Sequence, residues 1–405
     1  RIMKYIAKMM LALLASVTMV AQAYAWDFGV TGSAEATFNQ ATSNSGATGA
    51  DTITTQDFGS AAGSIVITSS HSSGDSSAAF SYTFDWDDNY DEVVKLSGST
   101  KAGEWTASSA IDFNRDSDSA AEEDRPNIAI TNGTTTIHMG LIAPVGSQST
   151  TGGAVSGGNV AFGRDDGGIG AYIDEYQGVG VTHKVSDTIT VAAALQMDKD
   201  AAILGEYSNV TASSSLSSGT QTTAQALSVS ANVGPVIGFS FGTGENKAVN
   251  SNDNATSGGY KASLTTMGLG VTMDLGGPSV AFTYASISGK QATAVDTKLD
   301  DTGMGVSFSM PMGSDSVVAS FTSVTQKTDT GTAVNASATG FEVGYNTNIG
   351  PVSLGLGYGS SSYSADTGAT FAHDGGGNGF DSTAATGKGD GATSTDLEVK
   401  MAYSW

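Results

Sequence analysis

The segment from Leu397 to Trp405 alternates apolar and polar residues without a break and ends on an aromatic residue. Leu397, Val399, Met401, Tyr403 and Trp405 share one parity. Because successive side chains of a strand point to opposite faces, this period of two predicts a strand between two different environments. Chain ends of soluble proteins are usually loose, whereas a closed β-barrel must pair its last strand with its first. The segment therefore favours a barrel, with an ordinary amphipathic edge strand as the alternative.

The first residues carry the pattern of an export signal. Lys4 and Lys8 are followed by an apolar run from Met9 to Val20 and by Ala23-Tyr24-Ala25, which together predict a secretory signal peptide over residues 1–25. The run is shorter than the ~20 apolar residues that a membrane-spanning helix needs. We therefore expect an exported chain that begins at Trp26 and can cross a membrane only as strands.

Composition excludes several classes of function. The chain has 17 basic and 40 acidic residues and a net charge of −23, which argues against a nucleic-acid partner, since phosphate binding needs Lys and Arg. The absence of cysteine excludes disulfides and thiolate metal sites, and we expect no cofactor. Charged residues make up only 14% of the chain, against about a quarter in a soluble domain. This balance is typical of a protein with apolar side chains facing lipid and small polar ones facing a lumen.

Alternating segments recur along the chain and predict about eighteen strands, or sixteen if the weaker segments 92–100 and 104–113 are not strands. Each is close to the ~9–11 residues that a tilted strand needs to cross a bilayer. Short turns alternate with long polar loops, as in outer-membrane barrels. The sequence thus predicts an all-β fold for residues 26–405: a transmembrane antiparallel up-and-down β-barrel of 16 to 18 strands. The expected long loops are residues 39–62, 114–126, 200–223, 246–258, 290–300, 328–336 and 363–393.

With a further local pattern, the chain resembles the general, non-specific porins of Gram-negative outer membranes. A hairpin over residues 127–140, turning at Asn132-Gly133, precedes a Gly/Ser-rich segment, 141–170, that contains Phe162-Gly163-Arg164-Asp165-Asp166. The family has a comparable hairpin before a loop that folds inward and narrows the barrel. The resemblance implies that 141–170 is this constriction loop, although it follows the seventh expected strand here and the fifth in the family.

The resemblance also implies a function and partners. It implies passive diffusion of ions and small hydrophilic solutes through a water-filled channel in the bacterial outer membrane. It implies contact with membrane lipid and lipopolysaccharide, assembly as a homotrimer, and reading of the last strand, through Tyr403 and Trp405, by the barrel assembly machinery. The family usually ends on Phe rather than Trp.

Charged residues of the expected loop and wall are the candidate site. In the family, acids on the constriction loop face bases on the wall, and the resulting field sets charge selectivity. Each charge has the alternative of being an ordinary solvated residue, and the excess of acid predicts a preference for cations. The candidates at the constriction are Arg164, Asp165, Asp166, Asp174 and Glu175; those on the wall are Glu35, Lys95, Asp112, His138, Lys184, Lys261 and Glu342.

Three other functions are weaker alternatives. An enzyme would need a His beside a nucleophile or an acid, and the four His residues show no such motif. A substrate-specific channel of the maltoporin type would need aromatic residues on the inward parity, where few occur. A surface adhesin built as a β-solenoid would show a short fixed repeat, and none is visible. The acidic clusters at 85–92 and 116–124 lack the spacing of a calcium loop.

Overall fold

A computed structural model gives the structure of the 405-residue chain. It describes residues 27–46, 51–86, 90–116, 122–123, 127–142, 148–150, 169–171, 176–198, 220–248, 261–292, 297–329, 333–366 and 390–405. The predicted signal peptide and most of segment 141–170 lie outside these residues, so both assignments stay predictions. No helix within the described ranges is long and apolar enough to span a membrane.

The chain divides into two units. Unit 1 comprises residues up to Ser33, Ala62–Asn132 and Trp405, and unit 2 comprises Ala34–Ala61 and Gly133–Ser404. Strands β1 (Asp27–Asn44) and β2 (Ile53–Ser73) contribute to both units. The other strands of unit 1 are β3 (Ser76–Trp86), β4 (Tyr90–Ala102), β5 (Trp105–Asp116), β6 (Glu122–Glu123) and β7 (Asn127–Thr131).

Unit 1 is an antiparallel meander in which β2 pairs with β3, β3 with β4, β4 with β5 and β5 with β7. Tight turns join these strands at Gly74 and Gly103, whose φ angles are 58° and 63°. Glycine adopts this left-handed conformation without the steric cost of a Cβ, so these two positions fix the hairpin registers.

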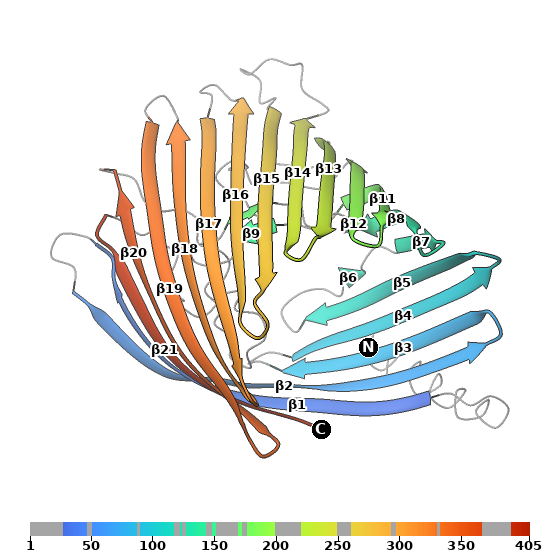
Figure 1. Ribbon diagram of the computed structural model, residues 1–405, viewed down its shortest axis with the longest axis horizontal. Coiled ribbons are helices and arrows are strands. Elements are labelled where there is room, and N and C mark those ends of the chain that lie inside the picture. Colours follow the sequence, from blue (N-terminus) through green and yellow to red (C-terminus); the bar gives the residue numbers. More distant parts are fainter. Residues whose placement is uncertain are drawn as a thin grey trace, which may run out of the picture. The chain divides into compact units, whose positions relative to one another are not determined.

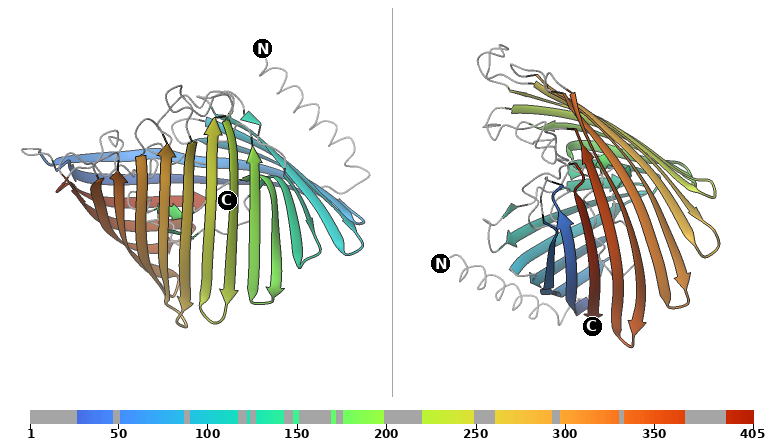
Figure 2. Two further views of the ribbon diagram at one scale, coloured as in Figure 1. Left: turned by 90° about the horizontal axis from the view of Figure 1, so that it is seen from above. Right: turned by 90° about the vertical axis from the view of Figure 1, so that its left-hand side faces the viewer.

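Unit 2 is also an antiparallel meander, in which each long strand pairs with the next long strand (Figures 1 and 2). Its strands are β8 (Thr135–Ile142), β9 (Gln148–Thr150), β10 (Ile169–Ala171), β11 (Tyr176–Ser186), β12 (Ile189–Asp198), β13 (Thr220–Asn232), β14 (Val236–Ala248), β15 (Lys261–Asp274), β16 (Ser279–Ala292), β17 (Thr297–Met312), β18 (Asp315–Asp329), β19 (Ala333–Ile349), β20 (Val352–Ala365) and β21 (Thr393–Ser404).

The pairing order is that of an up-and-down β-barrel. One sheet contains nineteen of the described strands, and its last strand, β21, pairs with its first, β1. Without the two-residue β6, eighteen strands remain, which confirms the predicted all-β antiparallel barrel of 16 to 18 strands. The last residue takes part in this pairing: Gly32 and Trp405 exchange two backbone hydrogen bonds, of 3.0 and 2.9 Å.

In unit 2 the large apolar side chains lie on the more exposed face of the sheet, and the small and polar residues lie on the more buried face. In β20, Gly355, Gly357 and Gly359 are buried on one face, whereas Leu356 and Tyr358 on the other face are 42% and 39% exposed. We call the first the polar face and the second the apolar face, and the same alternation runs through β13–β21. A soluble protein buries its large apolar side chains, so this inverted distribution is one that a lipid environment would explain.

Several strands extend into segments that we predicted to be loops. β1 continues to Asn44 and β2 begins at Ile53, and both residues lie inside the expected loop 39–62. Only residues 293–296 separate β16 from β17, within the expected loop 290–300. Polar side chains pair across these extensions, as between Gln56 and Gln40 at 2.7 Å. The prediction of long loops was wrong here because these extensions are mostly polar and carry no regular apolar alternation.

Candidate functional site

Charged side chains gather on the polar face of unit 2 where β20 carries glycine. Gly355, Gly357 and Gly359 pair in turn with Lys400, Glu398 and Asp396 of β21. Since glycine has no side chain, the charged residues of β21 face no cross-strand side chain of β20 at these three positions. On the other side of β20, Gly359 pairs with Glu342 of β19, one of the predicted wall residues. We call Glu35, Glu342, Asp396, Glu398 and Lys400 the charged cluster.

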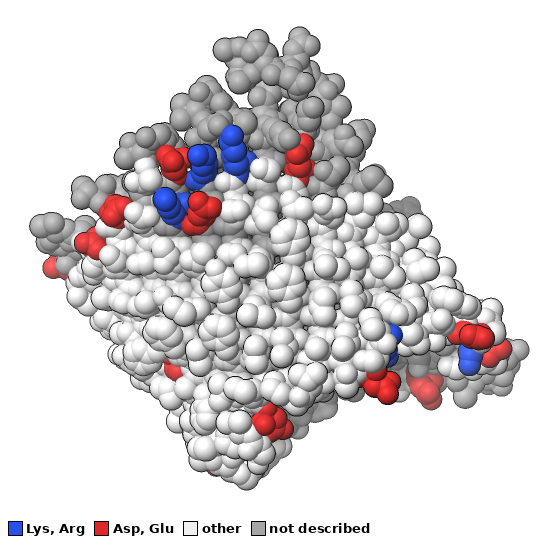
Figure 3. All heavy atoms as spheres, turned by 45° about the horizontal axis from the view of Figure 1, so that its top comes forward, with Lys and Arg blue, Asp and Glu red and all other residues white. Residues whose placement is uncertain are grey.

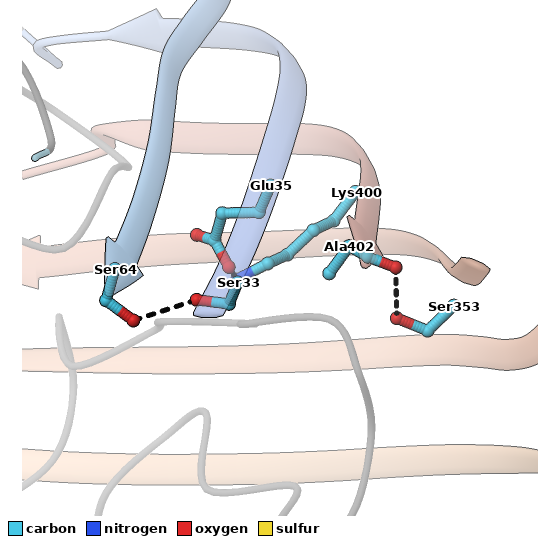
Figure 4. A network of polar contacts seen from close by, with 6 residues as sticks. All are labelled: Ser33, Glu35, Ser64, Ser353, Lys400 and Ala402. Atoms are coloured by element: carbon cyan, nitrogen blue, oxygen red, sulfur yellow. Dashed lines mark hydrogen bonds and ion pairs between the residues drawn. The ribbon is translucent and has the colours of Figure 1, made fainter. Parts of the chain in front are cut away.

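An ion pair joins the last strand of the cluster to the first strand of the chain. The Lys400 Nζ lies 2.9 Å from the Glu35 Oε2, and the two side chains are 14% and 35% exposed. Figure 4 shows both side chains extending toward each other between β1 and β21. Glu398 interacts electrostatically with Asp396, Lys400 and Glu35. The Lys400 ammonium group therefore lies among several carboxylates, and the cluster has a net negative charge.

Two carboxylates of the cluster are deeply buried. Glu342 is 2% exposed and Asp396 is 3% exposed. They flank Gly359, so one strand separates them, which corresponds to about 10 Å between the two strands. The Ser320 hydroxyl donates a long hydrogen bond of 3.5 Å to the Glu342 Oε2. The two carboxylates therefore add to the acidic character of the polar face.

Above the cluster, the polar face continues as a row of hydroxyl groups. The Ser361 and Ser394 hydroxyls lie 2.6 Å apart, and Ser361 donates to the Tyr363 hydroxyl at 3.2 Å. Below it, the Ser353 hydroxyl donates to the Ala402 carbonyl at 3.1 Å (Figure 4). The buried hydroxyls of Ser361, Ser394 and Tyr363 thus satisfy one another, since each can both donate and accept.

The remaining wall candidates are placed elsewhere. In unit 1, the Lys95 Nζ lies 3.0 Å from the Asp112 Oδ2, so these two candidates neutralise each other. In unit 2, the His138 Nε2 lies 3.4 Å from the Thr182 hydroxyl, and Lys184 is exposed at the turn end of β11. For Lys261 only the backbone is described, at the start of β15.

The five constriction candidates lie outside the described residues: Arg164, Asp165, Asp166, Asp174 and Glu175. Within the same segment, β9 and β10 form an antiparallel ribbon in which Gln148 pairs with Ala171, and this ribbon contacts β14–β17. Figure 1 labels β9 of this ribbon beside β15 and β16. The assignment of 141–170 as a constriction loop remains a prediction.

Asp396 is a member of the cluster that the sequence reasoning missed. The expected strand began at Leu397 and the expected loop ended at residue 393, so Asp396 fell between them. The signal was present, because Ser394 and Asp396 continue the alternation of Glu398 and Lys400. Among the described residues, no group of three or more acidic or histidine side chains has a geometry that would hold a metal ion.

The fold has solved counterparts. No known protein-family profile and no curated protein matches the chain. An anion-selective porin from Comamonas acidovorans is similar in structure, with a TM-score of 0.51 and 12% identity over 94% of this chain and 100% of that chain. The chain has the porin fold. The trimer form of the outer-membrane protein OmpT of Vibrio cholerae also matches, with a TM-score of 0.49 and 13% identity over 94% of this chain and 100% of that chain.

Proposed function

We propose that this chain is an outer-membrane porin through which ions and small hydrophilic solutes diffuse passively, with a preference for cations. The observation that carries the proposal is the inverted distribution of side chains. The exposed face of unit 2 carries Leu356, Phe341 and Phe321, 42–48% exposed, while the buried face carries Gly, Ser and carboxylates. Lipid against the first face accounts for its exposed apolar side chains, and the small and polar residues of the second face are those expected on the lumen side of a porin.

The charged cluster supports the preference for cations. Four carboxylates and one lysine share the polar face of β1, β19 and β21, so a cation that passes this wall is attracted and an anion is repelled. The similar Comamonas porin is described as anion-selective. We expect this chain to prefer cations instead, because the charged cluster on its wall is mainly acidic and a shared fold does not determine the charge of the wall.

Location and assembly follow from the same proposal. The barrel resides in the bacterial outer membrane after export, in contact with lipid and lipopolysaccharide, and the barrel assembly machinery recognises its last strand through Tyr403 and Trp405. It assembles as a homotrimer, and segment 141–170 narrows the channel. We expect no catalytic activity.

Single-channel recording of the purified protein in a planar bilayer tests the proposal. We expect stepwise conductance and a reversal potential in a potassium chloride gradient that indicates cation preference. At about 10 Å in water, one charge changes the energy of an ion by about 0.4 kcal/mol. Glu342→Gln and Asp396→Asn should therefore each lower the cation-to-anion permeability ratio about twofold or more.

The control is Glu104→Gln, which removes one acid from an exposed turn of unit 1 and should leave the ratio unchanged. Absence of conductance steps would reject the channel. Anion preference of the unmodified protein, or equal effects of the cluster variants and the turn variant, would reject the role of the cluster. Conductance that sugars block would favour a substrate-specific channel instead.

A further inference from the structure

Lys400 is a lysine on the polar face of a long strand rather than at a rim. Figure 3 shows a broad face of the molecule on which charged side chains gather along the edges. Lys400, by contrast, lies within β21, and only 14% of its side chain is exposed. Its ammonium group therefore depends on acceptors of neighbouring strands, and it lies 2.9 Å from the Glu35 Oε2 of β1.

A second acceptor lies on the opposite side of Lys400. Asn346 of β19 pairs with Gly355 of β20, and Gly355 pairs with Lys400. Because directly paired residues share one face of a sheet, Asn346 and Lys400 both lie on the polar face with a glycine between them. No side chain of β20 separates the two residues at this level.

The side-chain oxygen of Asn346 is a buried acceptor that lacks a donor. Asn346 is 4% exposed, and its Oδ1 has no hydrogen-bond partner among the described residues. The Nδ2 of the same amide donates to the Ser316 hydroxyl of β18 at 3.4 Å. The nitrogen end of the amide thus faces β18, and the oxygen end is left for a donor from another strand. Burying an oxygen without a donor is costly, and a lysine ammonium group has three donors.

The distance between the two residues suits a lysine. Two strand spacings, or about 10 Å, separate β19 from β21. The five bonds of an extended lysine side chain cover about 6 Å, and the shorter asparagine side chain covers about 3 Å. A hydrogen bond of about 3 Å closes the remaining distance. The Lys400 ammonium group can therefore reach Glu35 on one side or Asn346 on the other.

We propose that Lys400 alternates between Glu35 and Asn346, and that Asn346 is thereby a determinant of ion selectivity. The role in selectivity rests on the proposed channel function. When Lys400 contacts Glu35, it neutralises a carboxylate whose side chain is 35% exposed. When Lys400 contacts Asn346, that carboxylate attracts passing cations. Glu398 lies on the same strand as Lys400 and attracts it in both positions.

Reversal potentials of the full-length protein in a potassium chloride gradient test the role of Asn346. Asn346→Leu removes the acceptor and leaves Lys400 with Glu35. The cation-to-anion permeability ratio should then fall by about twofold, the effect of one charge on an ion at about 10 Å in water. Gly355→Val keeps both acceptors but places a side chain between Asn346 and Lys400, so it should have the same effect. In a Lys400→Gln background, neither change should alter the ratio.

The matched control is Asn348→Leu. Asn348 lies on the same strand as Asn346, but it is exposed and pairs with Ser353 rather than with a glycine. Its replacement should leave the permeability ratio unchanged. An unchanged ratio in Asn346→Leu, or an equal fall with and without Lys400, would overturn the proposal.

A second measurement separates this inference from the proposed function, because it does not depend on conduction. Urea unfolding in detergent micelles gives the effects of Asn346→Leu and Lys400→Gln on stability, separately and together. Residues at such a distance that share no contact have additive effects, so a combined loss smaller than the sum supports the alternate contact, and additivity would overturn it. Non-additive effects without conductance would refute the channel and leave the contact standing. Conductance with additive effects would do the reverse.

Discussion

The contact between Gly32 and Trp405 permits a quantitative test of how the last strand joins the first. A Cβ built at Gly32 would lie 2.5 Å from the Trp405 Cε2 and 2.9 Å from its Cη2, and real Cβ atoms do not approach a neighbour so closely. The indole therefore lies across β1 where only glycine leaves room for it. Gly32→Ala must either push the ring off β1 or separate the two strands.

Pushing the ring off β1 and separating the two strands should cost similar free energies. Inserting a methylene into a packed contact costs about 1–3 kcal/mol. Trp405 is 52% exposed, so about half of the ~200 Å² of a tryptophan is covered. Uncovering that half to water would cost about 2.5 kcal/mol at 25 cal/mol per Å², and less where detergent covers the ring. We therefore expect Gly32→Ala to lower the free energy of unfolding by about 1–3 kcal/mol. The assay is urea unfolding of protein refolded in detergent micelles, followed by far-ultraviolet circular dichroism.

A double-mutant cycle identifies the cause. In a Trp405→Ala background the obstacle is absent, so Gly32→Ala should be neutral or stabilise by about 0.5–1 kcal/mol, as expected when alanine replaces glycine in a strand. Gly98→Ala is the control, because its Cβ would meet only the Ser77 carbonyl oxygen at an ordinary 3.4 Å. A Gly32→Ala cost that equals the Gly98→Ala effect, or that persists without Trp405, would refute the reasoning.

Two further predictions concern the ion pairs. Lys95→Gln should lower the free energy of unfolding by no more than about 1 kcal/mol, because Lys95 and Asp112 are 52% and 26% exposed and exposed ion pairs contribute little; urea unfolding that reveals a loss above about 2 kcal/mol would contradict this. Glu35→Gln and Lys400→Gln should shift the reversal potential in opposite directions, each by about a twofold change in permeability ratio, and shifts of the same sign would show that the pair does not act through its charge.

Apolar alternation predicted the strands and therefore the fold. Leu354, Leu356 and Tyr358 identify β20, and Asn132-Gly133 identifies the turn between β7 and β8. Alternation could not give the strand ends beyond the membrane, where pairs such as Thr42 and Thr54 join by their hydroxyls at 3.1 Å. Polar residues on both faces satisfy the sheet there, and no periodic signal distinguishes them from a loop.

The site was less predictable because it depends on register. Parity alone predicted Glu35 and Glu342 as wall residues, and in the structure they lie beside Lys400 and Gly359. The meeting of Glu35 with Lys400, however, requires the first and last strands to pair, and no local pattern encodes that contact. Asp396 was missed for the related reason that its strand begins earlier than its apolar residues indicate.

The apolar face of β16–β18 carries a nine-residue band without charge, and this band has a consequence for where the protein can reside. Its spans run from Val280 to Ser288, from Thr302 to Met310 and from Val317 to Thr325. At about 3.3 Å per residue and a tilt of about 40°, it spans about 23 Å along the membrane normal. A thicker bilayer would draw Lys290, Asp300 and Lys327 into hydrocarbon, at a cost that rises with each ångström of mismatch. Hydrocarbon thickness would then sort this chain among membranes independently of any targeting signal.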